Sequence, residues 1–534
     1  MRPVPMGVLV PVLALSCVVG SPRTSAAQAG RAELTGQVRD AAGAVVPECR
    51  VTVTEVTTNL AVAVTTGPQG VFNLPYLRPG TYRISAEAAG FRPSVREGVH
   101  LATGERIRID VTLAVGAFSD AATVTADASL LQTESSSLGE VVDNRSVMQL
   151  PLNGRSYLPL VALVPGVALP PGSAFPRLSG GRPRVNEYLY DGISVLQPEP
   201  GAVPYFPIID AIQEFKVVTN APPAEFGRFN GGVINLSTKA GSNQLHGSAF
   251  AFLRNERLNA RNLFAPSTSA NPDKPEFRRN QFGFVLGGPI VKDETFFFAD
   301  YQGTRQSIGR VRISTVPTTL QRQGVFTESV AGRVPAIFDP GTTRPGTGGA
   351  VTRDPFPANT IPSDRIDPVA AELLSRYPLP NLPGTANNYR RVGSEGDDQD
   401  QFDVRVDHRA SAQDQLFARF SYFRDLTNPV TPLPDGSGTL TSGAIGRTDT
   451  RAQSAVLSYV HSFGTNVVND LRLGIRAGRS AARACSWATL RPRPCACRGS
   501  PPTRPTKTRS LRSRSTASSN SGRPPTRTRT PPLT

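Results

Sequence analysis

The sequence predicts a mainly β protein with a β-sandwich, a mixed α/β domain, a set of long amphipathic strands and a disordered basic tail. Its 534 residues include 48 Gly and 49 Pro, a turn-rich composition typical of β proteins. Strict alternation of apolar and polar residues, which is the period of a half-buried strand, recurs along the chain, for example in residues 106–113 and 401–407. The alternation stops before residues 479–534, which contain no Val, Ile, Phe or Tyr.

The formal net charge of +16 is concentrated in that tail. Residues 479–534 hold 13 Lys or Arg and no Asp or Glu, so the rest of the chain is nearly neutral. Strong basicity can indicate nucleic-acid binding. This tail lacks the interleaved aromatic residues on which bases stack, so we expect no nucleic-acid partner.

The first 27 residues are typical of a secretory signal peptide. Arg2 supplies the positive charge, residues 8–19 are apolar, and small residues follow, with Ala27 and Ala29 as candidate cleavage positions. Two alternatives are a buried core segment and a lipoprotein signal ending at Cys17. No later stretch offers about 20 continuous apolar residues, so we expect no transmembrane helix.

Residues 33–115 form the predicted sandwich. The alternating segment 106–113 places four apolar residues on one face, and Gly- and Pro-rich turns separate about seven short strands over roughly 80 residues. Cys49 is the one cysteine between the signal and the tail, so we expect no disulfide there. Phe72 and Tyr82 fall on apolar faces and are predicted core residues.

This segment resembles the carboxypeptidase regulatory-like domain, a transthyretin-like sandwich that precedes many outer-membrane receptors. The resemblance rests on the pattern GxVxDxxG at 36–43, VP at 46–47, GxFxLxxLxPGxY at 70–82 and GF at 90–91. It implies either a spacer without a ligand or a module that binds carbohydrate or peptide.

Residues 120–243 alternate less and should contain two short helices, one capped by Asp143 and one starting near Ser156 and ending at Pro165-Gly166. Their motifs are QLPLNGR at 149–155, YLYDG at 188–192, IQEF at 212–215, AEFG at 224–227, GGVIN at 231–235 and TKAGSN at 238–243. In this order they resemble the α/β plug domain of Oar-like TonB-dependent receptors.

That resemblance also implies a contact with TonB, which pulls an extended segment by β-strand addition. The candidate contact residues are Asp120, Thr123, Val124, Thr125 and Ala126, since the β-branched run suits an added strand. An inert linker strand is the alternative.

Residues 244–478 are predicted to form the N-terminal part of a transmembrane β-barrel. Apolar residues at 402, 404 and 406 alternate with polar ones, as expected for lipid-facing and lumen-facing positions. The seven predicted strands lie near 246–255, 279–290, 294–304, 401–410, 415–424, 451–463 and 466–476. The Pro- and Gly-rich segment 314–400 is an expected extracellular loop, and a soluble sandwich is the alternative fold.

The tail at 479–534 begins inside the last of these strands. Its composition cannot bury enough apolar surface to fold, and we interpret it as the product of a frameshift, with a genuine basic tail as the alternative. We therefore expect an incomplete transmembrane β-barrel, an open curved sheet with residues after about 478 unpaired, and no transport by the polypeptide as translated.

The sequence shows no catalytic, cofactor-binding or metal-binding motif. The four His are scattered, and no nucleophile or phosphate-loop signature is present. We therefore expect no enzyme, but a TonB-dependent receptor or transporter of the outer membrane, with TonB, lipid and a large extracellular ligand (glycan or peptide) as partners. An envelope carbohydrate- or peptide-binding module carried by the sandwich is the alternative function.

Overall fold

The computed structural model describes most of the chain between residues 31 and 483. The described residues are 31–116, 122–125, 135–170, 173, 175–196, 203–223, 226, 229–261, 263, 267, 274–330, 332–434, 446–463 and 467–483. Within these ranges, none of the helices combines the length and the apolar character needed to cross a membrane.

The N-terminal domain is the predicted β-sandwich. One sheet has the order β4-β1-β7 with β8 also paired to β1, and the other has the order β3-β2-β5-β6-β9. The strands are β1 (Ala32–Asp40), β2 (Arg50–Glu55), β3 (Ala61–Thr65), β4 (Val71–Leu77), β5 (Gly80–Glu87), β6 (Ser94–Leu101), β7 (Arg106–Arg108), β8 (Val111–Leu113) and β9 (Ala122–Thr125). Phe72 and Tyr82 lie in the core between the sheets, as predicted, and Cys49 is buried with a free thiol.

The predicted single strand at 106–113 is divided into β7 and β8. Both halves pair with β1 in parallel, but the carboxylate of Asp110 accepts a hydrogen bond from the backbone N–H of Gln37 (2.9 Å) and interrupts the ladder. Gly36 makes this close approach possible, because a Cβ there would lie 1.9 Å from the carbonyl oxygen of Ile109. The four apolar side chains still face the core, as their period of two requires.

The central domain, residues 135–243, has a five-stranded sheet of order β10-β15-β16-β13-β14. Its elements are β10 (Leu138–Asp143), α1 (Asn144–Gln149), α2 (Leu158–Val161), β11 (Val167–Ala168), β12 (Arg177–Leu178), β13 (Glu187–Tyr190), β14 (Ile193–Ser194), β15 (Ile212–Asn220) and β16 (Val233–Thr238). Asp143 caps α1 as predicted, since its side chain accepts from the N–H of Ser146. The second helix is shorter than predicted and stops at Val161, before Pro165-Gly166.

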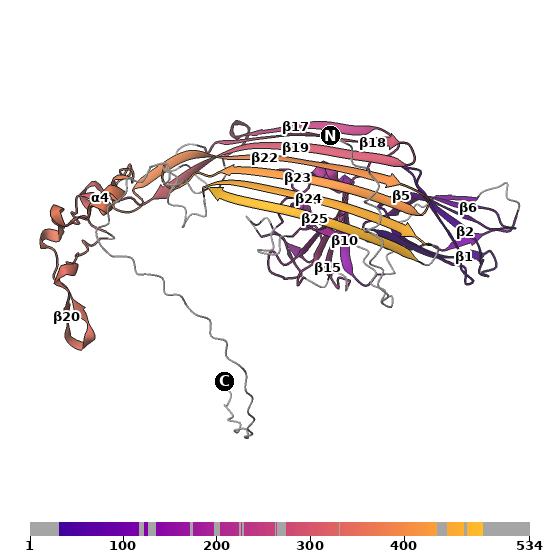
Figure 1. Ribbon diagram of the computed structural model, residues 1–534, viewed down its shortest axis with the longest axis horizontal. Coiled ribbons are helices and arrows are strands. Elements are labelled where there is room, and N and C mark those ends of the chain that lie inside the picture. The colour runs from indigo at the N-terminus through magenta and orange to yellow at the C-terminus, as the bar shows by residue number, and fades with distance from the viewer. Residues whose placement is uncertain are drawn as a thin grey trace, which may run out of the picture. The chain divides into compact units, whose positions relative to one another are not determined.

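Seven long antiparallel strands form the third part (Figure 1). In sheet order they are β17 (His246–Asn255), β18 (Phe277–Val291), β19 (Thr295–Ser314), β22 (Tyr389–Arg409), β23 (Asp414–Asn428), β24 (Arg447–Ser462) and β25 (Val468–Arg483). All seven predicted strands are therefore present. Within the described residues β17 and β25 pair on one side only, so the sheet is not closed into a barrel.

The sheet buries many of its polar residues and exposes many of its apolar ones, although Phe296, Phe298 and Phe417 are buried. In β22, Asp403 and Asp407 are buried, whereas Val404 and Val406 are exposed, and Leu473 of β25 is exposed as well. A soluble sheet would have the opposite arrangement, whereas a barrel strand places its apolar side chains toward lipid. The soluble-sandwich alternative is therefore excluded for these strands.

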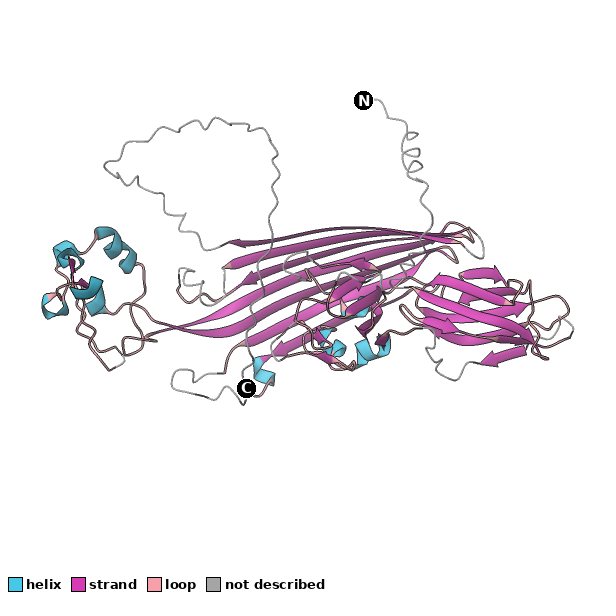
Figure 2. Cartoon of the chain, turned by 90° about the horizontal axis from the view of Figure 1, so that it is seen from below, coloured by secondary structure: helices cyan, strands magenta, loops and turns pink. Residues whose placement is uncertain are grey.

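The connections between the strands differ at the two ends of the sheet. The connections are three to five residues long at 292–294, 410–413 and 463–467, and much longer at 256–276, 315–388 and 429–446. The segment 315–388 contains β20 (Arg344–Pro345), β21 (Val351–Thr352), α3 (Thr319–Arg322) and α4 (Pro368–Ser375), and it lies at the end of the sheet away from the sandwich (Figures 1 and 2). The sandwich contacts the short turns through Asn59, which donates to Asp293 (3.1 Å). The sandwich therefore lies at the end of the sheet where the connections are short.

Three strand limits differ from prediction by more than five residues, the first being the end of β19 at Ser314 rather than near 304. β22 begins at Tyr389 rather than near 401, because the polar run at its start gives no visible alternation and pairing with β19 defines the strand instead. β25 continues to Arg483, paired with β24 beyond the predicted break at about 478. Residues 479–483 are thus paired, because a ladder needs backbone donors and acceptors and no particular side chains.

The sandwich core gives the first testable prediction. We expect residues 33–115 to fold alone, and Tyr82→Ala to lower their free energy of unfolding by about 3–5 kcal/mol through loss of a buried aromatic side chain. Tyr82→Phe is the matched control: it removes only the hydrogen bond to the carbonyl oxygen of Arg78, 2.8 Å away, and should cost about 1 kcal/mol. Urea denaturation measures both changes, and a Tyr82→Ala fragment as stable as the parent would contradict the core assignment.

Candidate functional site: the interface of the central domain with the sheet and the sandwich

The inner face of the seven-stranded sheet carries the polar side chains that meet the central domain. Arg405 and Asp407 of β22 and Arg419 and Ser421 of β23 are all buried, with 8% or less of each residue exposed. Because side chains two residues apart share a face of a strand, the polar phase of the alternation places these groups together. The arrangement requires a partner for each buried guanidinium, since a buried charge without one is costly.

Asp191 of the central domain is that partner. It follows β13 in the two-residue turn Asp191-Gly192, which joins Tyr190 of β13 to Ile193 of β14. Both turn residues have positive φ, +49° for Asp191 and +82° for Gly192. A type I′ hairpin needs this conformation, and an Asp-Gly pair adopts it readily. The turn holds the carboxylate at the end of the sheet, where it faces β22 and β23.

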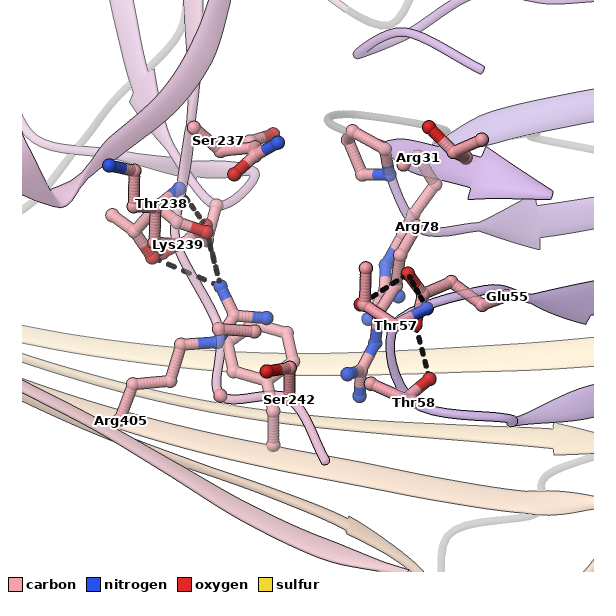
Figure 3. A pocket seen from close by; sticks show the side chains of 18 of the residues that line it. Arg31, Glu55, Thr57, Thr58, Arg78, Ser237, Thr238, Lys239, Ser242 and Arg405 are labelled. Carbon is pink, nitrogen blue, oxygen red and sulfur yellow. Dashed lines mark hydrogen bonds and ion pairs between the residues drawn. The ribbon is translucent and has the colours of Figure 1, made fainter. Parts of the chain in front are cut away.

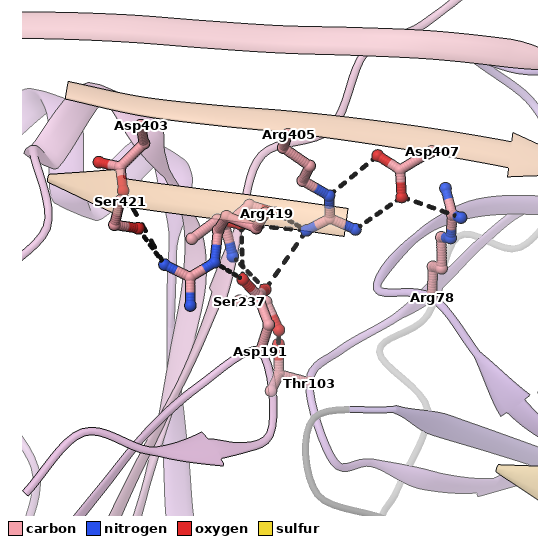
Figure 4. A network of polar contacts seen from close by, with 10 residues as sticks. Arg78, Thr103, Asp191, Ser237, Asp403, Arg405, Asp407, Arg419 and Ser421 are labelled. Carbon is pink, nitrogen blue, oxygen red and sulfur yellow. Dashed lines mark hydrogen bonds and ion pairs between the residues drawn. The ribbon is translucent and has the colours of Figure 1, made fainter. Parts of the chain in front are cut away.

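The carboxylate of Asp191 is the centre of a buried ion network (Figure 4). It accepts from the backbone N–H (3.0 Å) and the hydroxyl (2.8 Å) of Thr238, and from Nη1 of Arg405 (3.3 Å). Nε of Arg419 lies 2.8 Å from Oδ2 in an ion pair without hydrogen-bond geometry. Arg405 in turn forms two hydrogen bonds to Asp407, 2.9 and 3.0 Å long. Two arginines of the sheet are thus bound to one carboxylate of the central domain.

The charges in this network are stabilised by one another. Burial by itself would raise the pKa of Asp191, but Arg419 and Arg405, helped by the two hydrogen bonds from Thr238, outweigh it and hold the pKa below its ordinary value. Asp191 is therefore ionised at neutral pH. Its contribution to stability is present above the unfolded pKa of about 3.9 and is lost as the pH falls through the lower, folded value.

The sandwich joins the same network through Arg78. This residue follows β4 and precedes Pro79-Gly80, and its Nη2 lies 3.0 Å from Oδ1 of Asp407. Asp407 is thereby shared between Arg405 of the sheet and Arg78 of the sandwich. All three parts of the chain therefore meet at connected charged groups.

A second set of contacts joins the sandwich to the central domain. Thr103, after β6, donates through its backbone N–H and its hydroxyl (2.6 Å) to Glu214 of β15. Lys216 donates to the carbonyl oxygen of Gly104 (2.9 Å), and His100 lies 3.6 Å from Glu214. The contact with Glu214 raises the pKa of His100 above its ordinary value, because the nearby carboxylate favours the protonated imidazole.

The motif at 149–155 anchors the other side of the central domain. Arg155 is held between the rings of Phe250 and Phe252 on β17, with its guanidinium 4.1 and 4.6 Å from the two centroids. It also pairs with Asp210 of the central domain and donates to Gln302 of β19 (3.2 Å). Through Arg155, this motif therefore holds the central domain against β17 and β19 of the sheet.

A cavity of about 430 Å³ lies where the sandwich, the central domain and the sheet meet. Figure 3 shows Arg31, Arg78 and Glu55 of the sandwich on one side of it, and Lys239 and Arg405 on the other. In the part of the chain that the structure describes, no three His, Cys, Asp or Glu residues are arranged to hold a metal ion.

The sequence-predicted site residues lie away from this network or outside the described residues. Thr123, Val124 and Thr125 belong to β9, which pairs in parallel with β6 at the edge of the sandwich. Asp120, Ala126 and the cleavage candidates Ala27 and Ala29 lie outside the described residues.

Sequence reasoning missed the roles of Arg78, Asp191, Arg405 and Arg419. The lumen-facing phase of the strand pattern contained a signal for Arg405, since a guanidinium on a buried strand face needs an anion. Nothing in the sequence identified Asp191 as that anion.

Comparison with known proteins gives two domain matches. Residues 33–114 match the family described as carboxypeptidase regulatory-like domain, and residues 237–494 match the family described as outer membrane beta barrel domain. The second match includes all seven strands of the sheet.

Curated proteins and solved structures similar to this chain include three transporters and receptors of the outer membrane. The chain is 30% identical over 333 residues to the TonB-dependent transporter Oar of Myxococcus xanthus, covering 58% of this chain and 30% of that protein. It is 27% identical over 128 residues to the probable TonB-dependent siderophore receptor PirA of Acinetobacter baumannii, covering 23% and 15%. The outer membrane transporter YddB of Escherichia coli aligns with a TM-score of 0.40 and 13% identity, covering 63% of this chain and 38% of that one. The chain thus spans less than a third of the curated relatives it matches.

The network predicts a large effect for Asp191→Asn. Removing the carboxylate charge leaves Arg405 and Arg419 with too little compensation in a buried site, so we expect a loss of about 3–5 kcal/mol in the free energy of unfolding. Glu97→Gln is the control, because Glu97 is half exposed and pairs with an exposed arginine; it should change stability by less than about 0.5 kcal/mol. Denaturation of the full chain in detergent measures both, and equal effects would contradict the role of Asp191.

The contact between His100 and Glu214 predicts a pH dependence. A raised folded pKa means that the contact stabilises the fold fully below the unfolded His pKa of about 6.5 and is lost as the pH rises through the folded value. The difference in unfolding temperature between the parent and His100→Gln should therefore shrink between about pH 6 and pH 9. Glu214→Gln should remove the pH dependence as well. A difference that grows with pH would refute this assignment.

Proposed function

We propose that this chain, a homologue of the TonB-dependent transporter Oar with a carboxypeptidase regulatory-like domain and an outer-membrane β-barrel domain, serves as a TonB-dependent receptor for a large ligand such as a glycan or a peptide. It is an outer-membrane protein. In this proposal residues 120–243 are the plug, and residues 244–478 contribute strands of the barrel wall around it. Residues 1–27 direct export, with cleavage near Ala27 or Ala29.

The observation that carries the proposal is how the central domain contacts the sheet. Asp191 and Thr238 form ion pairs and hydrogen bonds with Arg405 and Arg419. Many apolar side chains of the sheet point away from this interface. When the domain moves, water can replace these polar contacts, because water offers equivalent donors and acceptors. An interface of apolar side chains would instead expose its apolar surface to water, which costs free energy. A plug that is stable when seated and still able to move under force needs this kind of interface.

The strand β9 supports a contact with TonB. Within the described residues it is an edge strand, paired with β6 on one side only. A partner protein can add a strand to the other side or draw β9 away from β6, and both need only backbone groups. Thr123, Val124 and Thr125 keep this segment extended, because β-branched residues favour strands.

The alternative, a carbohydrate- or peptide-binding sandwich, has less support. Phe72 and Tyr82 are buried, and the exposed large apolar residues among residues 31–116 are valines alone. The other two aromatic side chains of the described sandwich, Tyr76 and Phe91, are half-buried, so this domain presents no fully exposed aromatic ring on which a sugar could stack. We also propose that the chain has no catalytic activity, in keeping with relatives that are transporters and receptors.

The test is a proline in β9. In a receptor with a closed barrel, Val124→Pro removes a backbone donor from the strand and should block strand addition. We expect uptake to fall at least about tenfold while ligand binding at the cell surface is unchanged. Val124→Thr, which keeps both the donor and the β-branched side chain, should transport normally. Undiminished uptake by Val124→Pro would place the TonB contact elsewhere in the chain.

A further inference from the structure

The cavity of about 430 Å³ at the junction of the three parts is lined by an excess of positive charge. Two arginines of the sandwich, one lysine of the central domain and two arginines of the sheet line it, whereas its carboxylates are Glu55 and Asp191. The five cationic residues are Arg31, Arg78, Lys239, Arg405 and Arg472. Figure 3 shows Arg31 and Arg78 on one side of the cavity and Lys239 and Arg405 on the other.

The carboxylates near the cavity are already engaged. Glu55 accepts from the hydroxyls of Thr57 (2.6 Å) and Thr58, and Asp191 is shared by Arg405 and Arg419. Outside the lining, Asp407 is shared by Arg405 and Arg78, and Asp470 pairs with Arg472 at 2.6 Å. Each of these carboxylates therefore has a partner, and none of them pairs with Arg31 within the described residues.

Arg31 is the most exceptional of these cations. It is 7% exposed, and its Nη1 is buried without a hydrogen-bond partner among the described residues. Its guanidinium carbon lies over the ring of Phe417, 5.6 Å from the centroid. Nε of Arg78 is likewise buried and without a hydrogen bond. A buried guanidinium with unused donors is costly to a protein.

The environment also opposes the charge of Arg31. Burial lowers its pKa to about 9, and the nearby Arg78, Arg472 and Arg405 act in the same direction, with only Asp470 opposing them. Arg31 still carries its charge at neutral pH. An additional negative group in the cavity would offset both the lost hydration and the repulsion among the arginines.

We infer that this cavity binds a small oxyanion, a phosphate or carboxylate group, between Arg31 and Arg78 of the sandwich and the cationic side chains opposite. Guanidinium groups present planar pairs of donors that match these oxygens, and their unused N–H groups are what such a ligand needs. A cation would add to the repulsion, and a neutral sugar would leave it uncompensated. The anion joins the sandwich to the central domain and the sheet, and its binding is independent of the transported ligand.

The test is thermal unfolding of the full chain in detergent with inorganic phosphate, malonate or chloride at constant pH and ionic strength. Phosphate or malonate should raise the unfolding temperature by at least ~2 °C relative to chloride. The more effective of the two identifies the oxyanion group. Calorimetric titration with the same anions should show saturable binding. If the parent protein shows neither a change in unfolding temperature nor saturable binding heat with these anions, the inference is wrong.

Substitutions then locate the site. Arg31→Gln should reduce the anion-dependent shift at least threefold, and in chloride it should unfold at the same temperature as the parent or higher, because it removes an uncompensated charge. A merely structural role for Arg31 would lower that temperature instead. Arg108→Gln, on the exposed sandwich surface, is the matched control and should keep the full shift. A full shift in Arg31→Gln, or its loss in Arg108→Gln, would refute the site.

Discussion

Two guanidinium groups on the inner face of the sheet, Arg405 and Arg419, are buried and need an anion. The nearest one on the central domain is Asp191, positioned by a two-residue turn with positive φ at both residues. The seating of the central domain depends on this pairing, because a buried charge that loses its partner destabilises a fold far more than an intact pair stabilises it. The network therefore determines where the domain sits more than how stable the protein is.

The requirement for such a network follows from the surroundings of the sheet. Its apolar side chains point outward, where lipid replaces water, so its polar side chains must be satisfied from within. A central domain that offers Asp191, Thr238 and Arg155 to the inner face supplies those partners. The same arrangement holds the central domain through ion pairs and hydrogen bonds, contacts that water can replace.

The sandwich is more than an appended domain. Arg78 shares Asp407 with Arg405, and Thr103 donates to Glu214, so the sandwich contacts both the sheet and the central domain through charged groups. The basic cavity lies at this junction. An anion there would change how firmly the three parts are held together, and the raised pKa of His100 adds a proton-dependent contact beside it.

The sequence by itself determined the local features of this protein. Period-two alternation identified all seven long strands and showed which side chains of residues 401–407 share a face of the sheet. Turn residues separated the sandwich strands, and Asp143 marked the start of a helix. Each of these signals lies within a few neighbouring residues. The motifs between residues 36 and 91 identified the sandwich, which matches the carboxypeptidase regulatory-like family over residues 33–114.

Only the tertiary structure decided which distant groups meet. Asp191 and Arg405 lie 214 residues apart, and no local pattern encodes their contact. The early start of β22 and the continuation of β25 to Arg483 depend on hydrogen bonding to a neighbouring strand, which side-chain patterns do not record. The excess positive charge of the cavity likewise could not be predicted from the sequence, because its cationic side chains come from three separate parts of the chain.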